Sequence, residues 1–240
     1  MKILQLCFRM PYPLKDGGAI AMFNMTKGLA DACADMTLLV PLTSKHDLDL
    51  DQLPLAVKNL AEIHSQRINS DITTMGAFRN LFTKKPYYLS RYLDNNFKTK
   101  LRQLLEDNTF DIILIESLKV SMYLPVIRQY SKAMVVLRSH NVEHLIWKRL
   151  AVQSNGLKKY FLDVMVSRLK KYEIKILNDF DAIASITSVD ADFFEKNGCK
   201  TPIIITPSGI DFDQFVADRK QIKPNTLFHL GALDWLPNIE

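Results

Sequence analysis

The sequence contains little glycine and cysteine and no long hydrophobic run. The three cysteines, Cys7, Cys33 and Cys199, stand singly without CxxC spacing. Isolated cysteines in odd number are typical of reduced, structural thiols. No stretch approaches the roughly 18 consecutive apolar residues of a membrane-spanning helix, and the N-terminal residues enter a strand-like segment directly in place of a signal peptide. These absences predict a cytoplasmic globular protein.

Two nucleotide-binding motifs are also missing. The chain has only eight glycines and contains neither GxGxxG nor GxxxxGK[ST]. The first absence argues against a dinucleotide cofactor, and the second argues against an NTPase, which uses the lysine of that motif to hold phosphates. We therefore expect no cofactor.

The net charge of +5 is distributed unevenly. Seven basic residues and one acid, Asp94, lie between Arg79 and Arg102, with aromatic residues interleaved. This segment is typical of a solvated helical face whose aromatic residues belong to the core, and it also suits peripheral contact of 79–102 with an anionic membrane surface or an acidic acceptor. No nucleic-acid-binding motif accompanies it, so no nucleic-acid partner is expected.

Short β-branched apolar runs alternate with segments of helical period. This alternation predicts an α/β fold, a Rossmann-like parallel sheet with helices on both faces. Helices are expected over 17–34 and 121–130, and a long helical pattern over 142–178 is expected to break at 154–156, where Asn and Gly are natural stops. The expected strands are 3–8, 36–41, 111–115, 133–137, 182–186 and 203–206.

The pattern restarts near the C-terminus. Residues 218–225 are polar and include Pro224, which is typical of a linker, and 226–230 then have the composition of a new strand. Ten further residues cannot build a second sheet. The sequence thus predicts one domain over 1–222, and a linker with the first strand of another domain over 223–240 of a larger protein.

Polar residues follow several of the expected strands. In doubly wound sheets ligands bind beyond the carboxyl ends of the strands. After the first strand, Gly17-Gly18 stands at a helix entrance, where the backbone can approach an anion such as a diphosphate closely. The alternative is a tight turn in which Asp16 caps the helix.

His140, Glu143 and His144 formally match the H-x-x-E-H pattern of zinc proteases. That pattern requires both histidines on one helix, whereas His140 is expected in a strand-to-helix loop, so we expect no metal site. A histidine at a strand end faces the ligand crevice, or else bonds a nearby carbonyl group. Glu116 has the same placement, suited to a sugar hydroxyl or merely to a helix N-terminus. Ser208 and Gly209 lie in the loop after the last strand.

In order and spacing, these pieces resemble the retaining GT-B glycosyltransferases of the large group 1 family, also called family 4. The resemblance covers most of the chain. It is carried by the opening strand and the segments Pro11-Tyr12-Pro13 with Gly17-Gly18, Ser139-His140-Asn141-Val142-Glu143, Pro207-Ser208-Gly209-Ile210-Asp211 with Phe215, and 228–238.

The resemblance implies two Rossmann-like domains facing one another, with 1–222 as the acceptor-side domain and 223–240 opening the donor-binding domain. It implies metal-independent transfer of a sugar, of hexosyltransferase type, from a nucleotide-diphosphate sugar to a sugar or lipid-linked acceptor in polysaccharide or glycolipid synthesis. The family's Glu-x7-Glu signature is not among these residues, so the chain alone is expected to be inactive. Two rival interpretations are a non-catalytic Rossmann-like binding module and a nucleotide-sugar epimerase.

By position, the resemblance assigns three groups of site residues. His140 would touch the transferred sugar as the catalytic residue. Donor binding falls to Gly17, Gly18, Ser208 and Gly209. Acceptor binding falls to Arg9, Tyr12, Asp16, Glu116 and Asn141.

Overall fold

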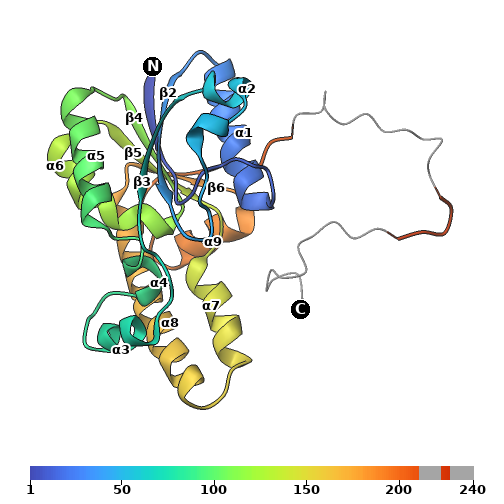
Figure 1. Ribbon diagram of the computed structural model, residues 1–240. Helices are drawn as coiled ribbons and strands as arrows, with labels where there is room; N and C mark the ends of the chain where they lie inside the picture. The colour runs from blue at the N-terminus through green and yellow to red at the C-terminus, as the bar shows by residue number, and fades with distance from the viewer. Residues whose placement is uncertain (211–222, 228–240) are drawn as a thin grey trace.

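A computed structural model describes residues 1–210 and 223–227 of the chain (Figure 1). The predicted strand over 226–230 and the motif residues Asp211, Phe215 and 228–238 fall wholly or mostly outside these residues. The predicted boundary between 222 and 223 likewise adjoins residues that are not described. The two-domain division therefore stays a prediction.

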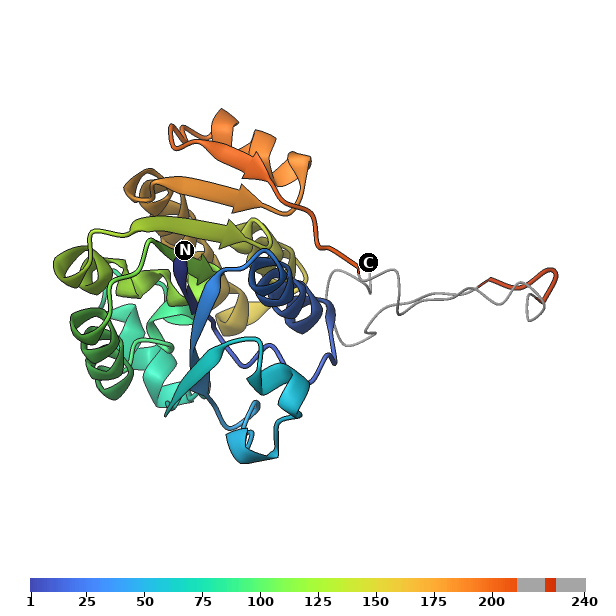
Figure 2. The same ribbon diagram turned by 90° about the horizontal axis from the view of Figure 1, so that it is seen from above.

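The core of the molecule is a seven-stranded sheet in which every pairing is parallel. The strand order is β3-β2-β1-β4-β5-β6-β7, which reverses direction between β1 and β4. Figure 2 shows β3 (cyan) at one edge and β7 (orange) at the other. The predicted α/β parallel sheet is confirmed. The strands are β1 (Lys2–Leu6), β2 (Asp35–Leu42), β3 (Glu62–Arg67), β4 (Ile112–Glu116), β5 (Met134–Ser139), β6 (Ala182–Ser185) and β7 (Ile203–Ile205).

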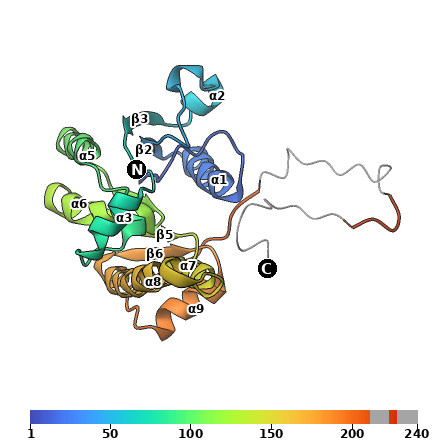
Figure 3. The ribbon, with the colours of Figure 1, turned by 60° about the horizontal axis from the view of Figure 1, so that its bottom comes forward.

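Helices cover both faces of this sheet, as predicted. Figure 3 shows α1 on one side of the sheet and α5 with α6 on the other. Because side chains alternate along a strand, Ile3 and Gln5 face α1, whereas Leu4 and Leu6 pack into the opposite layer. The α-helices are α1 (Gly17–Asp31), α2 (Leu55–Lys58), α3 (Thr74–Leu81), α4 (Tyr87–Ser90), α5 (Asn95–Asp107), α6 (Leu124–Tyr130), α7 (Glu143–Val152), α8 (Gly156–Ile176) and α9 (Ser188–Lys196).

The long helical pattern over 142–178 does break where Asn and Gly predict it. Helix α7 ends at Val152 and α8 begins at Gly156, so the two form a hairpin. The hydroxyl of Ser154 donates to the carbonyl of Leu150 across the turn, at 2.8 Å. The expected helix over 121–130 is in part a 3₁₀ helix, Leu118–Tyr123, and α6 starts afresh with Pro125 in its first turn, where proline costs no hydrogen bond.

Strand β3 and helices α2 to α5 and α9 are not among the predicted elements. The β3 sequence, Glu62–Arg67, is polar and its side chains are mostly half-buried. An edge strand pairs on one side only and needs no continuous apolar run, so the apolar-run criterion misses it.

The basic segment 79–102 divides between core and surface. Tyr87, Tyr88 and Phe97 are buried, as the core interpretation predicts, but Phe82 is exposed. The membrane contact predicted for this segment is not tested by these facts. Within the described ranges, no helix combines the length and hydrophobicity needed to cross a bilayer.

The buried central strand gives a direct test of the fold. Ile113 of β4 is 0% exposed, whereas Ile204 of edge strand β7 is 61% exposed. We expect Ile113→Ala to lower the free energy of unfolding by about 2–5 kcal/mol, because it leaves a cavity in the core. The matched change Ile204→Ala should cost less than about 1 kcal/mol. Urea denaturation of both variants measures the difference, and equal losses would contradict the burial of β4.

Candidate functional site

Three polar side chains are buried next to one another at the carboxyl ends of β1, β4 and β5. They are Gln5, Glu116 and Arg138, and each is at most 1% exposed. The amide nitrogen of Gln5 donates to Oε1 of Glu116 at 2.8 Å, and Nη1 of Arg138 approaches the same oxygen at 3.4 Å. A carboxylate is costly to bury unless it is paired, so the network compensates the charge of Glu116.

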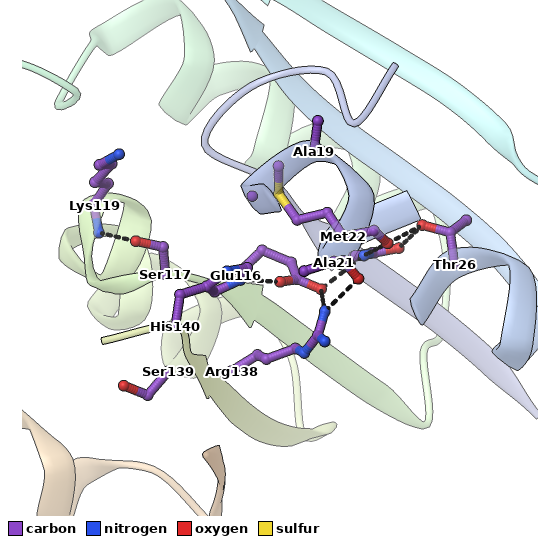
Figure 4. A network of polar contacts seen from close by, with 12 residues as sticks. Ala19, Ala21, Met22, Thr26, Glu116, Ser117, Lys119, Arg138, Ser139 and His140 are labelled. Carbon is purple, nitrogen blue, oxygen red and sulfur yellow. Dashed lines mark hydrogen bonds and ion pairs between the residues drawn. The ribbon is translucent and has the colours of Figure 1, made fainter. Parts of the chain in front are cut away.

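The same network holds helix α1 against the sheet. Nη1 of Arg138 donates to the carbonyl oxygen of Ala21 at 2.8 Å, and the hydroxyl of Thr26 donates to Oε1 of Gln5 at 2.7 Å. Figure 4 shows Glu116 between Arg138 and His140, with Thr26 reaching the network from α1. The helix that follows the first strand is thereby fixed at the point where the strand order reverses.

His140 lies in the loop after β5, as predicted, and its side chain is 10% exposed. Its Nε2 is 2.7 Å from Oε2 of Glu116. An ionised carboxylate only accepts hydrogen bonds, so Nε2 carries a proton, and in the neutral tautomer the lone pair is on Nδ1. Nδ1 makes no hydrogen bond within the described part of the chain, which leaves it available as an acceptor.

Opposing effects act on the pKa of Glu116. Burial by itself raises this pKa, but the hydrogen bond from His140 and the charge of Arg138 outweigh burial, so the net pKa lies below the ordinary value. Glu116 is therefore a carboxylate that orients His140. Both of its oxygens are engaged by protein groups, and it is 0% exposed.

The N-terminus of α1 is capped from within the chain. Oδ1 of Asp16 accepts hydrogen bonds from the backbone N–H groups of Gly18 and Ala19 at 2.9 and 3.1 Å, and Asp16 also pairs with Arg9. The capping alternative is thus confirmed. A Cβ on Gly18 would lie 3.0 Å from Nη2 of Arg9, so Gly18 makes room for that guanidinium, whereas Gly17 borders open space.

The loop after β7 reaches α1. Ser208 and Gly209 are exposed, and the carbonyl oxygen of Gly209 accepts a hydrogen bond from Asn24 of α1 at 2.5 Å. Helix α1 therefore connects the two groups of predicted donor residues. Gly17 and Gly18 begin this helix, and Asn24 of the same helix bonds Gly209. Tyr12 packs against Phe23 of the same helix, with ring centroids 6.5 Å apart.

A second buried carboxylate, that of Glu143, lies at the start of α7. Glu143 accepts a hydrogen bond from the hydroxyl of Tyr88 at 2.9 Å, and burial raises the pKa of this carboxyl group. Half-buried Lys119 places Nζ 4.0 Å from the ring centroid of Phe8. Desolvation lowers the pKa of Lys119, and the charge of Glu143 opposes this effect. The ring of Phe8 also meets that of His140, with centroids 6.2 Å apart, so Lys119 lies near His140.

The H-x-x-E-H residues do not converge on one point. His140 bonds Glu116, whereas Nδ1 of His144 lies 2.6 Å from Glu173 of α8. Glu173 also accepts hydrogen bonds from the backbone N–H groups of Glu143 and His144, and its carboxylate thereby caps α7. In the described ranges, no group of three or more His, Cys, Asp or Glu residues could hold a metal ion. The metalloprotease geometry is absent from this segment.

Solved structures similar to this chain include two that contain UDP sugars. HepE from Anabaena, solved with UDP-glucose, matches 92% of this chain and 47% of its own at 13% identity, with a TM-score of 0.52. Sucrose-phosphate synthase from Thermosynechococcus elongatus matches 90% and 50% at 13% identity, with a TM-score of 0.56. UGT2 of Phytolacca americana, solved with UDP-2fluoro-glucose and pterostilbene, matches 86% and 54% at 11% identity, with a TM-score of 0.50.

This likeness concerns the fold alone. The chain has a Rossmann-like fold similar to that of GT-B glycosyltransferases. It spans about half the length of these solved proteins. No family model matches the sequence. No curated protein matches it either.

Sequence reasoning missed the residues that support His140. Gln5 and Arg138 lie inside apolar strands, as KILQL and MVVLRS show. A polar residue within an apolar strand is the available signal, because it requires a buried partner. Lys119 had no such signal, because it lies in a short 3₁₀ helix that the sequence pattern does not predict. Of the predicted residues, the structure brings Glu116 and His140 together, and Arg9, Asp16 and Gly18 together. The carbonyl of Asn141 accepts from the Ser139 hydroxyl.

The lowered pKa of Glu116 gives a pH test. Its carboxylate stabilises the fold above the ordinary value of 4.5, and this stabilisation is lost as pH falls through the lowered pKa. We expect Glu116→Gln to cost about 3 kcal/mol at neutral pH, since Arg138 loses its counter-charge, and the cost should shrink below about pH 4.5. Urea denaturation across pH measures this. The exposed Glu62→Gln should show a negligible cost throughout, and a pH-independent cost for Glu116→Gln would refute the charge network.

Proposed function

We propose that the chain is the N-terminal, acceptor-side half of a GT-B glycosyltransferase that uses a nucleotide-sugar donor. The observation that carries this proposal is the His140–Glu116 pair, which stands at the carboxyl ends of β5 and β4, beside the strand reversal. Ligands of open α/β sheets bind at this edge. The likeness in fold to HepE and UGT2, both solved with UDP-sugars, supports the same ligand class here.

His140 is proposed to contact the transferred sugar. Glu116 fixes the ring so that Nδ1 offers a lone pair, and a sugar hydroxyl can donate a hydrogen bond to it. In this role His140 is a catalytic residue by contact, while Glu116 is a positioning residue buried behind it. This refines the acceptor-binding role predicted for Glu116.

The donor diphosphate is proposed to approach Gly17 and the loop of Ser208 and Gly209. Gly17 borders open space, which permits close approach of a ligand to the backbone. Asp16 already occupies the N–H groups of Gly18 and Ala19, so an anion would have to compete with that carboxylate or be held by the facing domain. As in the resembled family, we propose retention at the anomeric carbon without a metal, with the leaving diphosphate stabilised mainly by donors on the second domain.

The acceptor is proposed to lie along Arg9, Tyr12 and Asn141. Arg9 is paired with Asp16, and its side chain is 13% exposed, so the guanidinium group is fixed beside the N-terminus of α1. A hexosyl transfer to a sugar or lipid-linked acceptor, in polysaccharide or glycolipid synthesis, is the proposed reaction, in the cytoplasm or at the inner face of the membrane.

The two rival interpretations, a binding module and an epimerase, predict different chemistry at the same residues. A non-catalytic binding module would use the crevice without needing an oriented histidine. A nucleotide-sugar epimerase would act on its donor with no acceptor at all. Mass spectrometry of products from a nucleotide-sugar panel separates the three, since only a transferase forms a glycosylated acceptor.

The role of His140 can be tested in a chain that carries both halves. We expect His140→Ala to lower kcat by about a hundredfold, because a contact to the transferred sugar is lost. His64→Ala, on edge strand β3 away from the crevice, is the control and should leave kcat unchanged. Near-normal turnover by His140→Ala would remove His140 from the mechanism.

The division of the site between two domains gives a separate test. The 240-residue chain assayed alone should show no transfer from UDP-glucose or from other nucleotide sugars, since it supplies only one wall of the cleft. Adding the second half should restore transfer. Robust turnover by the chain alone would contradict this assignment while leaving the His140 test unaffected.

A further inference from the structure

Helix α3 has an unusual distribution of side chains. Met75 and Phe78 are 58% and 59% exposed, and Phe82, just past the helix end, is 80% exposed. Their spacing of three and four places them along one stripe of the helix. The polar Asn80 is instead buried, where it bonds Thr83. The apolar stripe therefore faces outward, which is the reverse of an ordinary surface helix.

The turn between α7 and α8 exposes further apolar side chains. Leu157 is 89% exposed, and Val152 and Tyr160 are also exposed. Of the large apolar side chains exposed in the described ranges, a substantial share lies in this turn and in the segment around α3. Scattered single residues of this kind are normal, but such a gathering marks an interaction surface.

The two segments are fixed to each other. Arg168 of α8 donates to the carbonyl oxygens of Asn80 and Leu81 at 2.9 and 2.8 Å. The rings of Tyr87 and Phe161 also meet, with centroids 6.1 Å apart. Figures 1 and 3 both show α3 beside α8. Helix α3 is thus held against α8, which begins at the α7–α8 turn; helix α3 and this turn are together called the tip below.

The tip carries an excess of positive charge, although Asp163 at its border pairs with Lys159 at 3.5 Å. Neither 72–93 nor 144–162 contains an Asp or Glu residue. The basic residues of the two segments are Arg79, Lys84, Lys85, Arg91, Lys148, Arg149, Lys158 and Lys159. Lys84, Lys85 and Lys158 are exposed.

We propose that the tip docks on an anionic lipid bilayer, with Phe78 and Phe82 entering the headgroup region and the surrounding lysines contacting lipid phosphates. Exposed aromatic side chains ringed by basic residues match such an interface in both hydrophobicity and charge. A protein partner would have to supply an equally acidic and apolar face, whereas an anionic bilayer presents both over its whole surface.

The tip lies at the same end of the sheet as His140. Figure 1 shows the α7–α8 hairpin and α3 extending beyond one end of the sheet. Helix α7 starts four residues after β5 ends, so this is the end at which the strands finish and His140 lies. A bilayer bound at the tip would be close to the candidate site. This surface shares 79–93 with the segment 79–102 predicted from sequence, but it leaves out α5 and its lysines and adds the α7–α8 turn.

Co-sedimentation of the 240-residue chain with lipid vesicles tests the proposal. We expect binding to vesicles of equimolar phosphatidylcholine and phosphatidylglycerol, weakened by salt, and little binding to phosphatidylcholine alone. Phe78→Ser with Phe82→Ser should weaken binding at least about tenfold. Lys84→Gln with Lys85→Gln should weaken it about 25-fold, at about fivefold for each charge.

Control variants change exposed apolar and basic residues elsewhere. Leu55→Ser with Val189→Ser removes two exposed apolar side chains outside the tip, and Lys132→Gln with Lys200→Gln removes two exposed charges before β5 and β7. Both pairs should bind vesicles normally, and circular dichroism should show all variants folded. Absence of vesicle binding, or equal loss in tip and control variants, would overturn the proposal. So would self-association that the serine variants abolish, because the tip would then be an interface between copies.

Discussion

The buried carboxylate of Glu116 is the constraint on which the site depends. A charge at 0% exposure must be compensated, and here Arg138 and His140 approach it from the next strand and loop while Gln5 approaches from the strand on its other side. The contacts to this carboxylate join the ends of β1, β4 and β5. They also orient the ring of His140, and Arg138 of the same network bonds α1. The side chains of the site are thus held in place by protein groups, as the sugar contact proposed for His140 requires.

The carboxylate of Glu173, in helix α8, has a comparable role at the base of the α7–α8 hairpin. Glu173 of α8 accepts the first N–H groups of α7 and bonds His144, so the hairpin that projects beyond the sheet is anchored at its base. Arg168, five residues earlier, ties the same helix to α3. Charged side chains of α8 therefore connect the sheet to the tip, and the exposed apolar side chains of the tip do not need core packing to stay in place.

Much of the fold was predictable because local rules decide it. Six of the strands follow from apolar runs, and the α7–α8 break follows from Asn155 and Gly156. The prediction failed at β3, whose sequence EIHSQR is polar because an edge strand pairs on only one side. It also omitted α3, whose stripe of apolar residues faces outward. In both places the surroundings, not the local pattern, determine what is buried.

The sequence by itself determined the parallel α/β sheet, the capping of α1 by Asp16 and the position of His140 at a strand end, since each depends on residues close together in the chain. Only the tertiary structure decided which groups meet. Glu116 lies 24 residues from His140 and 111 from Gln5, and no local pattern specifies such pairs. Their contact arises because parallel strands bring their carboxyl ends to one edge, where burial then forces each charge to find a partner.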